Sequence, residues 1–210
     1  PDLISLVFVT NISDFNFSGK QFGEDSRNTI KLFDLNGTTV NIKAFKTPII
    51  INRLIYGSIR KSKAQRSFEF ANRLFSLGIK SPTPIAYYEF SNFGFFGKSY
   101  YISKHLNCDL TFRELTKDLN YPDHEIILRA FTRFTFQLHE NGINFLDHSP
   151  GNTLVKKVGK EYEFYLVDLN RMNFGFMDFD NFKSYILGIP VVRWNFEISK
   201  SDIFGFYVVP

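Results

Sequence analysis

The chain has 210 residues, of which 44% are hydrophobic and 18% aromatic, and it suits a globular protein with one domain or two small lobes. No run of about 18 apolar residues occurs, so we expect no transmembrane helix. The single cysteine, Cys108, excludes an internal disulfide and a cysteine-based zinc site. The histidines lack metal-ligand spacing, so we also expect no zinc.

The formal net charge of +4 is modest, but the basic residues are unevenly placed. The segment Ile49–Phe68 contains five basic residues and no acidic one. Such a basic segment suits phosphates or an anionic membrane surface, although the charged side of a solvated helix has the same composition. Its basic residues are Arg53, Arg60, Lys61, Lys63 and Arg66.

The first expected elements are mostly strands. Residues 1–10, PDLISLVFVT, read as a strand, and NTIKLF and TTVNIKAF flank DLNG, whose Asn-Gly pair is a strong hairpin signal. A helix is expected over Lys63–Leu77, because Ser62 and Gln65 have capping-box spacing and Gly78 can end it. After the breaker SPTP, IAYYEF and SYYISKHL are expected to form another antiparallel pair.

The sequence changes character near Asn107. From Asp123 to Glu140 apolar residues recur at helical spacing, and Gly142 supplies a stop. NTLVKKV and YEFYLVD then form a hairpin around Gly159-Lys160. We therefore predict an α+β protein with a sheet-and-helix unit over 1–106 and a helical unit with a short hairpin over 107–210. The apolar positions of the long helix are Ile126, Ile127, Ala130, Phe131, Phe134 and Leu138.

The loop NFLDHSPGNTLV, between the long helix and the hairpin, contains Asp147 and Asn152, and Asp168 ends the second hairpin strand. Three oxygen-bearing side chains can therefore converge. Such oxygens suit Mg²⁺, which takes one or two protein carboxylates and further ligands from phosphates and water, and the third group can act as a base. Taken alone, D-x-x-x-x-N is also the composition of an ordinary turn.

Together with V-N-I-K in an upstream strand, these motifs resemble those of protein kinases, in which the same spacing joins the catalytic Asp to a metal-binding Asn. The resemblance implies a two-lobed protein-kinase-like fold, with an N-terminal antiparallel sheet plus one helix and a reduced, mainly helical C-terminal lobe. It also implies that Asp147 is the catalytic base and that Asn152 and Asp168 bind Mg²⁺. Lys43 would contact the α- and β-phosphates of ATP, with Lys46 as the alternative.

The resemblance also suggests further nucleotide-binding residues. Gly19 and Gly23, in SGKQFGEDSRN, form the best glycine-bearing loop for covering phosphates. His105, in the connecting run SKHLNCDL, marks the expected contact region for adenine. Glu69 is the only carboxylate of the first helix and should pair with Lys43, but its position among polar residues equally fits a surface acid.

Three features depart from the protein-kinase pattern. Phe145 stands where the histidine before the catalytic aspartate is usual, no full G-x-G-x-x-G occurs, and the residues after Asp168 lack the usual glycine and an A-P-E element. These departures keep open a degraded, non-catalytic kinase. Against that reading, the catalytic aspartate, both metal-binding residues and the lysine are all present, whereas a pseudokinase commonly lacks one.

More specifically, the chain resembles the lipopolysaccharide kinase family, the Kdo and heptose kinases of the inner core. The similar segments are RKSKAQRSFEFANRLFSLGIKSPTPIAYYE, LHENGINFLDHSPGNTL and FYLVDLNRM, with G-I-x-x-P-x-P and D-x-N-R as the most specific motifs. The resemblance spans roughly Asn28–Met172. It implies ATP and Mg²⁺ as cofactors and transfer of the γ-phosphate to a sugar hydroxyl in the cytoplasm, at the inner face of the inner membrane.

The partners implied are a sugar or glycolipid substrate and, peripherally, the anionic surface of the inner membrane, with no nucleic acid. Two alternatives remain open from the sequence. One is a protein or other small-molecule kinase on the same fold, and the other is a nucleotide-binding protein without catalysis.

Overall fold

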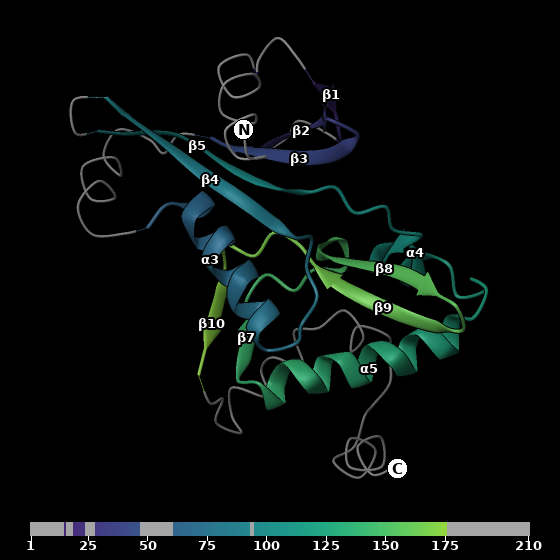
Figure 1. Cartoon of the computed structure of the whole chain (residues 1–210). Coiled ribbons are helices and arrows are strands. Elements are labelled where there is room, and N and C mark those ends of the chain that lie inside the picture. The colour runs from purple at the N-terminus through teal and green to yellow at the C-terminus, as the bar shows by residue number, and fades with distance from the viewer. Residues whose placement is uncertain (1–14, 16–18, 24–27, 47–60, 93–94, 176–210) are drawn as a thin grey trace. The chain divides into compact units, whose positions relative to one another are not determined.

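The computed structural model describes Phe15 and residues 19–23, 28–46, 61–92 and 95–175 (Figure 1). The strand expected at residues 1–10 lies outside the described residues, as do Arg53 and Arg60 of the basic segment. The chain divides into two compact units. The first comprises Pro1–Cys108 and Tyr165–Arg171, and the second Asp109–Phe164 and Met172–Pro210. Asp168 therefore belongs to the same unit as Lys43.

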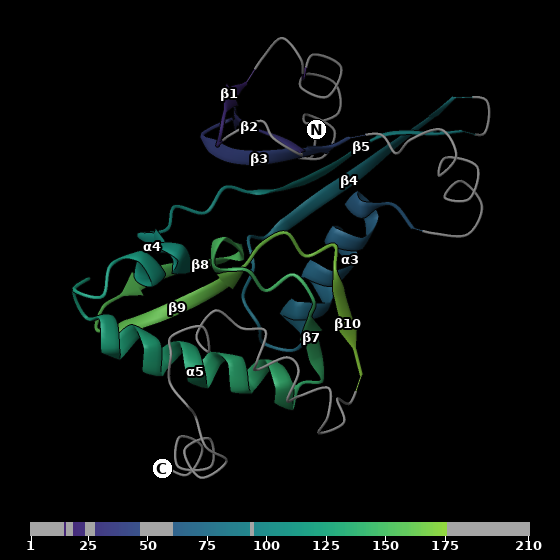
Figure 2. The same ribbon diagram turned by 180° about the vertical axis from the view of Figure 1, so that it is seen from behind.

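A five-stranded antiparallel sheet in the order β1-β2-β3-β5-β4 forms the centre of the first unit (Figures 1 and 2). Asn36 and Gly37 have φ values of 52° and 81°, as the tight turn of a two-residue hairpin requires. Both predicted strand pairs are confirmed. The strands are β1 (Lys20–Gln21), β2 (Asn28–Leu35), β3 (Thr38–Phe45), β4 (Pro84–Asn92) and β5 (Phe95–Lys104).

The strand register separates the two faces of this sheet. Lys43 lies opposite Ile30 on β2 and Tyr101 on β5, and directly opposed residues share a face. Val40 and Ile42 alternate with Lys43 and are fully buried on the other face. The lysine thus projects from the face opposite the hydrophobic core. That core contains Phe15, Phe33, Leu35, Val40, Ile42, Ala86, Tyr100 and Ile102.

The helix α3 (Lys63–Ser76) of the first unit packs against β4 and β5. Ser62 caps its N-terminus, since the side-chain oxygen accepts a hydrogen bond from the Gln65 backbone N–H at 2.9 Å. Gly78 follows the helix with φ of 72°. The predicted helix is confirmed and ends one residue earlier than expected. Its buried residues are Ala64, Ser67, Ala71 and Leu74.

The described part of the second unit is a small mixed region of helices and short strands (Figures 1 and 2). One sheet has the order β6-β8-β9, and β7 pairs with β10. No helix among the described residues combines the length and apolar character needed to cross a membrane. The elements are β6 (Leu110–Thr111), α4 (Phe112–Lys117), α5 (His124–Glu140), β7 (Ile143–Phe145), η2 (Pro150–Asn152), β8 (Thr153–Val158), β9 (Glu161–Leu166) and β10 (Met172–Phe174).

The long helix α5 is buried along one side. Phe131 stacks on Phe112 at 4.0 Å between ring centroids and contacts Phe164 at 5.5 Å. Ile126 and Ile127 were both among the predicted apolar positions, but only Ile127 is buried, whereas Ile126 lies on the solvent side of the helix and is 54% exposed. Gly142 ends the region as predicted, with φ of 63°. The other buried residues of α5 are Ile127, Phe134, Thr135 and Leu138.

Candidate active site

An ion pair between Lys43 and Asp168 is the main polar feature of the first unit. The Lys43 Nζ lies 2.8 Å from Asp168 Oδ1, and the two side chains are 13% and 27% exposed. The lysine comes from β3, whereas the aspartate follows β9, far along the chain. Two oppositely charged residues that the sequence analysis assigned to one nucleotide site are therefore in contact.

The backbone holds Asp168 in an unusual conformation. Its φ is 59°, in the left-handed region that costs most residues about 1–2 kcal/mol, although Asp tolerates it better than most. Leu166, two residues earlier, is anchored by a hydrogen bond from its N–H to the Lys80 carbonyl at 3.0 Å. Asn170 Nδ2 donates to Asp168 Oδ1 at 2.6 Å. Backbone strain of this kind is concentrated at functional sites.

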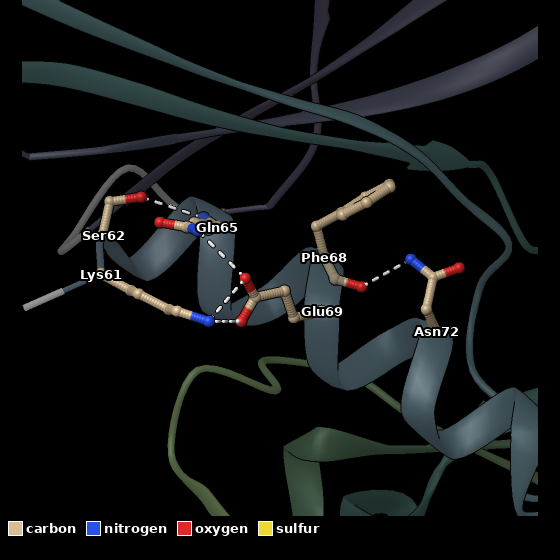
Figure 3. A network of polar contacts seen from close by, with 6 residues as sticks. All are labelled: Lys61, Ser62, Gln65, Phe68, Glu69 and Asn72. Carbon is tan, nitrogen blue, oxygen red and sulfur yellow. Dashed lines mark hydrogen bonds and ion pairs between the residues drawn. The ribbon is translucent and has the colours of Figure 1, made fainter.

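Glu69 does not pair with Lys43, and that sequence prediction is wrong. Both of its carboxylate oxygens accept from Lys61 Nζ, at 2.8 and 2.7 Å, and one also accepts from Gln65 Nε2 at 3.0 Å (Figure 3). The physical reason is the orientation of α3. Glu69 lies on the polar side of α3, and its carboxylate extends back toward the N-terminal end of the helix, where it meets Lys61 (Figure 3).

This network also changes the interpretation of the basic segment. Lys61 is paired with the Glu69 carboxylate, although its side chain stays 58% exposed, so one lysine of the basic segment has an acidic partner on the same surface. Gln65, expected to complete a capping box with Ser62, turns its side chain toward Glu69 instead (Figure 3). Only the half of the capping box in which Ser62 accepts from the Gln65 backbone is present.

In the second unit, the loop that begins at Asp147 is held by its own hydrogen bonds. The backbone carbonyl of Asp147 accepts from the Ser149 N–H at 2.7 Å and from Asn152 Nδ2 at 2.8 Å. The Asn152 N–H in turn donates to the Ser149 carbonyl at 2.9 Å. The loop therefore joins Asp147 and Asn152 directly, as the motif spacing suggested.

The Asn152 amide has a defined orientation. A carbonyl oxygen such as that of Asp147 only accepts hydrogen bonds, so the amide nitrogen of Asn152 must face it and Oδ1 must point away. Oδ1 has no hydrogen-bond donor among the described residues. On Asp168, Lys43 and Asn170 both bind Oδ1, and no described residue donates a hydrogen bond to Oδ2.

The oxygens Asn152 Oδ1 and Asp168 Oδ2 have the chemistry of Mg²⁺ ligands, because Mg²⁺ prefers hard oxygen donors and usually takes few of them from protein. The described residues contain no cluster of three or more His, Cys, Asp or Glu side chains that could hold a metal ion. Each oxygen, taken by itself, suits a metal that takes most of its ligands from phosphates and water.

His148, next to Asp147, packs its ring against the aromatic residues Phe145 and Phe131. Its ring stacks on Phe145 at 5.3 Å between centroids and contacts Phe131 at 5.6 Å. Its Nε2 lies 3.0 Å from Thr153 Oγ1. Burial, and secondarily the nearby His139, lowers the pKa of His148 to about 4. Burial also lowers the pKa of His139 to about 4.

We expect the unfolding free energy to fall as the pH drops from about 6.5 toward 4. Both histidines stay neutral in the folded chain over this range, whereas the unfolded chain protonates them near 6.5, so the unfolded state binds more protons. Replacing either residue, by His139→Gln or His148→Gln, should remove roughly half of the change in urea midpoint between pH 7 and 5. The control is His124→Gln, and an unchanged pH dependence in both variants would contradict the prediction.

His105 and the glycine-bearing loop lie in the first unit. The His105 N–H donates to the Thr39 carbonyl at 2.9 Å, and the His105 ring meets the exposed ring of Phe22 edge-on at 5.3 Å. Gly19 has φ of 83°, and a Cβ there would lie 2.5 Å from the Phe33 ring, so packing already explains this glycine. Gly23 has φ of 79°, and a Cβ added there would meet no other atom within 4 Å. Their contact with phosphates stays a prediction.

Three neighbours of these residues were not predicted from the sequence. Asn170 is fixed to Asp168, Phe22 lies on His105, and Arg113 of α4 lies against Gly151. Asn170 follows Asp168 in the D-x-N-R motif, and this motif was the only sequence feature that could have indicated their contact. The other two contacts join residues far apart in the chain, so no local pattern indicates them.

The five-stranded antiparallel sheet with one helix, followed by a small mixed region with the Asp147 loop and its hairpin, is the protein-kinase-like fold. The predicted fold class is confirmed. By sequence, the chain matches no known protein family and no curated protein.

Three solved structures illustrate the likeness. "WaaP in complex with acyl carrier protein" matches with a TM-score of 0.63 and 15% identity, over 93% of this chain and 79% of that one. WbdD matches with a TM-score of 0.55 and 15% identity, over 80% and 36%. The MAP kinase LmaMPK10 from Leishmania major matches with a TM-score of 0.50 and 16% identity, over 73% and 46%. At such identities the likeness establishes the fold alone.

Proposed function

We propose that this protein is a kinase that transfers the γ-phosphate of ATP to a sugar hydroxyl of the lipopolysaccharide inner core. The observation that carries the proposal is the ion pair between Lys43 and Asp168. The kinase fold supplies a lysine and a metal-binding aspartate from distant parts of the chain, and here they meet at 2.8 Å.

Phosphoryl transfer is catalysed mainly by positioning and by neutralising phosphate charge. In the proposed reaction, Lys43 exchanges its contact with Asp168 for the α- and β-phosphates. Asp147 accepts the proton of the acceptor hydroxyl while that oxygen bonds to the γ-phosphorus. The bond from phosphorus to the bridging oxygen breaks, and ADP leaves. Gly19, Gly23 and His105 are the proposed contacts for the rest of the nucleotide.

Asn152 and Asp168 would hold Mg²⁺. When bound, Mg²⁺ neutralises the charge that the β- and γ-phosphate oxygens carry. The hydrogen bond from Asn152 Nδ2 to the Asp147 carbonyl keeps the amide oxygen turned outward for this purpose. Asp168 keeps one carboxylate oxygen on Lys43 and Asn170 and leaves the other for the metal.

Two observations support a glycan acceptor. The motifs between Gly78 and Pro84 and at Asp168–Arg171 resemble those of the Kdo and heptose kinases. The fold resembles that of WaaP over 93% of the chain. In this proposal the substrate lies at the inner face of an anionic membrane, where the exposed Lys63 is better suited to contact it than Lys61.

A non-catalytic nucleotide-binding protein is the second candidate, because Glu69 is bound to Lys61. Active protein kinases require an ion pair between the strand lysine and the helix glutamate. Here the lysine is bound by Asp168 and the glutamate by another lysine. Catalysis in this chain therefore requires that Lys43 act without Glu69, or that α3 rearrange when ATP binds.

The proposal is tested by ATP consumption against a panel of acceptors. The panel contains inner-core sugars, both free and in anionic glycolipid vesicles, together with a generic protein and small alcohols. We expect Mg²⁺-dependent phosphorylation of a core sugar. Phosphorylation of the protein alone would replace the glycan proposal with a protein kinase, and ATP binding without turnover on any acceptor would favour the non-catalytic candidate.

A further inference from the structure

The side chain of His148 forms a hydrogen bond across the loop that begins at Asp147. Its Nε2 lies 3.0 Å from Thr153 Oγ1. Thr153 is the first residue of β8 and is fully buried, so its place is set by the hairpin. The bond therefore links the start of the loop to a strand that is packed in the second unit.

The loop contains a second link of the same span. Asn152 Nδ2 donates to the Asp147 carbonyl at 2.8 Å, and the bond between His148 and Thr153 joins the next residue at each end. The proposed base and the proposed metal ligand are thus each followed directly by a residue of the second bond. Loss of that bond should loosen both ends of the first.

The His148 ring is fixed by packing as well as by the hydrogen bond. It stacks on Phe145 with 25° between the ring planes, and it contacts Phe131 of α5. Both phenylalanines are buried. A side chain whose rotamer is locked by packing and by a hydrogen bond can hold its neighbours in one arrangement.

The charge state of His148 suits this role. Burial lowers its pKa to about 4, so the ring is neutral near pH 7. A neutral imidazole has one donor and one acceptor nitrogen, and the Thr153 hydroxyl can serve either of them. The ring therefore makes its bond without placing a positive charge beside Asp147.

We propose that His148 is a positioning residue, which holds Asp147 and Asn152 in a fixed arrangement through its bond to Thr153 and its stack on Phe145. The inference rests on the proposed kinase function, in which Asp147 is the base and Asn152 binds the metal. Phosphoryl transfer depends on positioning, and a displacement of about 1 Å can cost on the order of 10²-fold in rate.

The test removes the hydrogen bond and keeps the packing. His148→Phe retains an aromatic ring on Phe145, and Thr153→Val removes only the hydroxyl from a side chain of the same shape. Each should lower kcat by about tenfold or more, while the Kd for Mg²⁺-ATP changes much less. Thr153→Ser keeps the hydroxyl and should retain most of the parent kcat.

Matched controls make the same chemical changes elsewhere in the second unit. His124 Nε2 lies 3.3 Å from the Leu115 carbonyl, and Thr132 Oγ1 donates to the Leu128 carbonyl at 2.9 Å. His124→Phe and Thr132→Val should therefore leave kcat unchanged at temperatures where every variant is fully folded. Equal losses in these controls, or full activity in Thr153→Val, would overturn the inference.

The double variant tests whether the two side chains act together. His148→Phe/Thr153→Val should have a kcat no lower than that of the weaker single variant, because both changes remove one bond. Additive losses would mean that the two residues act independently and that the inference is wrong.

A measurement by NMR separates this inference from the proposed function, because it requires no acceptor. The side-chain amide signals of Asn152 are assigned by their absence in Asn152→Asp. In the parent, the proton donated to the Asp147 carbonyl should exchange slowly with water, and Thr153→Val should accelerate this exchange on the order of tenfold. His148→Phe carries the same measurement if Thr153→Val fails to fold.

The two proposals then fail in different ways. Faster exchange in the variant, together with no phosphorylation of any acceptor, leaves the positioning role of His148 standing and removes the kinase proposal. Unchanged exchange removes the positioning role whatever the activity.

Discussion

The substitution Asp147→Asn should lower kcat on the order of 10²-fold or more while nucleotide binding stays nearly intact. Removing a general base leaves the acceptor hydroxyl without a group to take its proton. The loop should keep its shape, because Ser149 and Asn152 donate to the backbone carbonyl of Asp147, which the substitution does not change. The loss should therefore appear in turnover, with little change in the Kd for Mg²⁺-ATP.

Single-turnover kinetics with the best acceptor, together with nucleotide titration, measure the two effects separately. Asp118→Asn is a suitable control, because Asp118 is an exposed acid of the same unit whose Oδ1 accepts from the Asn120 N–H, a role that an asparagine oxygen can keep. A loss in Asp147→Asn no greater than in this control would mean that D-H-S-P-G-N is only a turn.

In the parent protein, Mg²⁺-ATP at about 100 times its Kd should add roughly 2.7 kcal/mol to the free energy of unfolding and raise the Tm. Asp168→Asn should lose most of this stabilisation at the same concentration, since it removes the carboxylate proposed to bind Mg²⁺. The variant also loses the ion pair with Lys43, so each Tm shift is measured against the same variant without nucleotide. ATP without Mg²⁺ isolates the metal-dependent part.

Glu69→Gln provides the matched control for this experiment. Its carboxylate is bound to Lys61, so the Mg²⁺-ATP shift should remain that of the parent. A loss as large as that of Asp168→Asn would show that Glu69 turns to Lys43 when nucleotide binds. No shift in the parent at millimolar Mg²⁺-ATP would contradict both the kinase and the nucleotide-binding proposals.

Features that depend on nearby residues were predictable from the sequence. The Asn36-Gly37 hairpin and the stop at Gly142 follow from left-handed backbone conformations that few residue types adopt easily. The Ser62 cap follows from a side-chain oxygen that can accept from a free N–H of the first helical turn. The loop from Asp147 to Asn152 is also local, since its hydrogen bonds span at most five residues. Its motif, with the upstream lysine, was therefore sufficient to indicate the kinase-like fold.

The partners of charged side chains were decided by the tertiary structure. Helical periodicity shows that Glu69 lies on the polar side of α3, but not which lysine that side meets, and the packed helix brings it to Lys61. Helical spacing selected both Ile126 and Ile127, but only Ile127 is buried, because the rotation of α5 depends on its packing partners. The contact between Arg113 and Gly151 joins α4 to a loop beyond α5. No repeat or spacing encodes such a contact, because it depends on how separately formed elements pack and on the space that a missing side chain leaves.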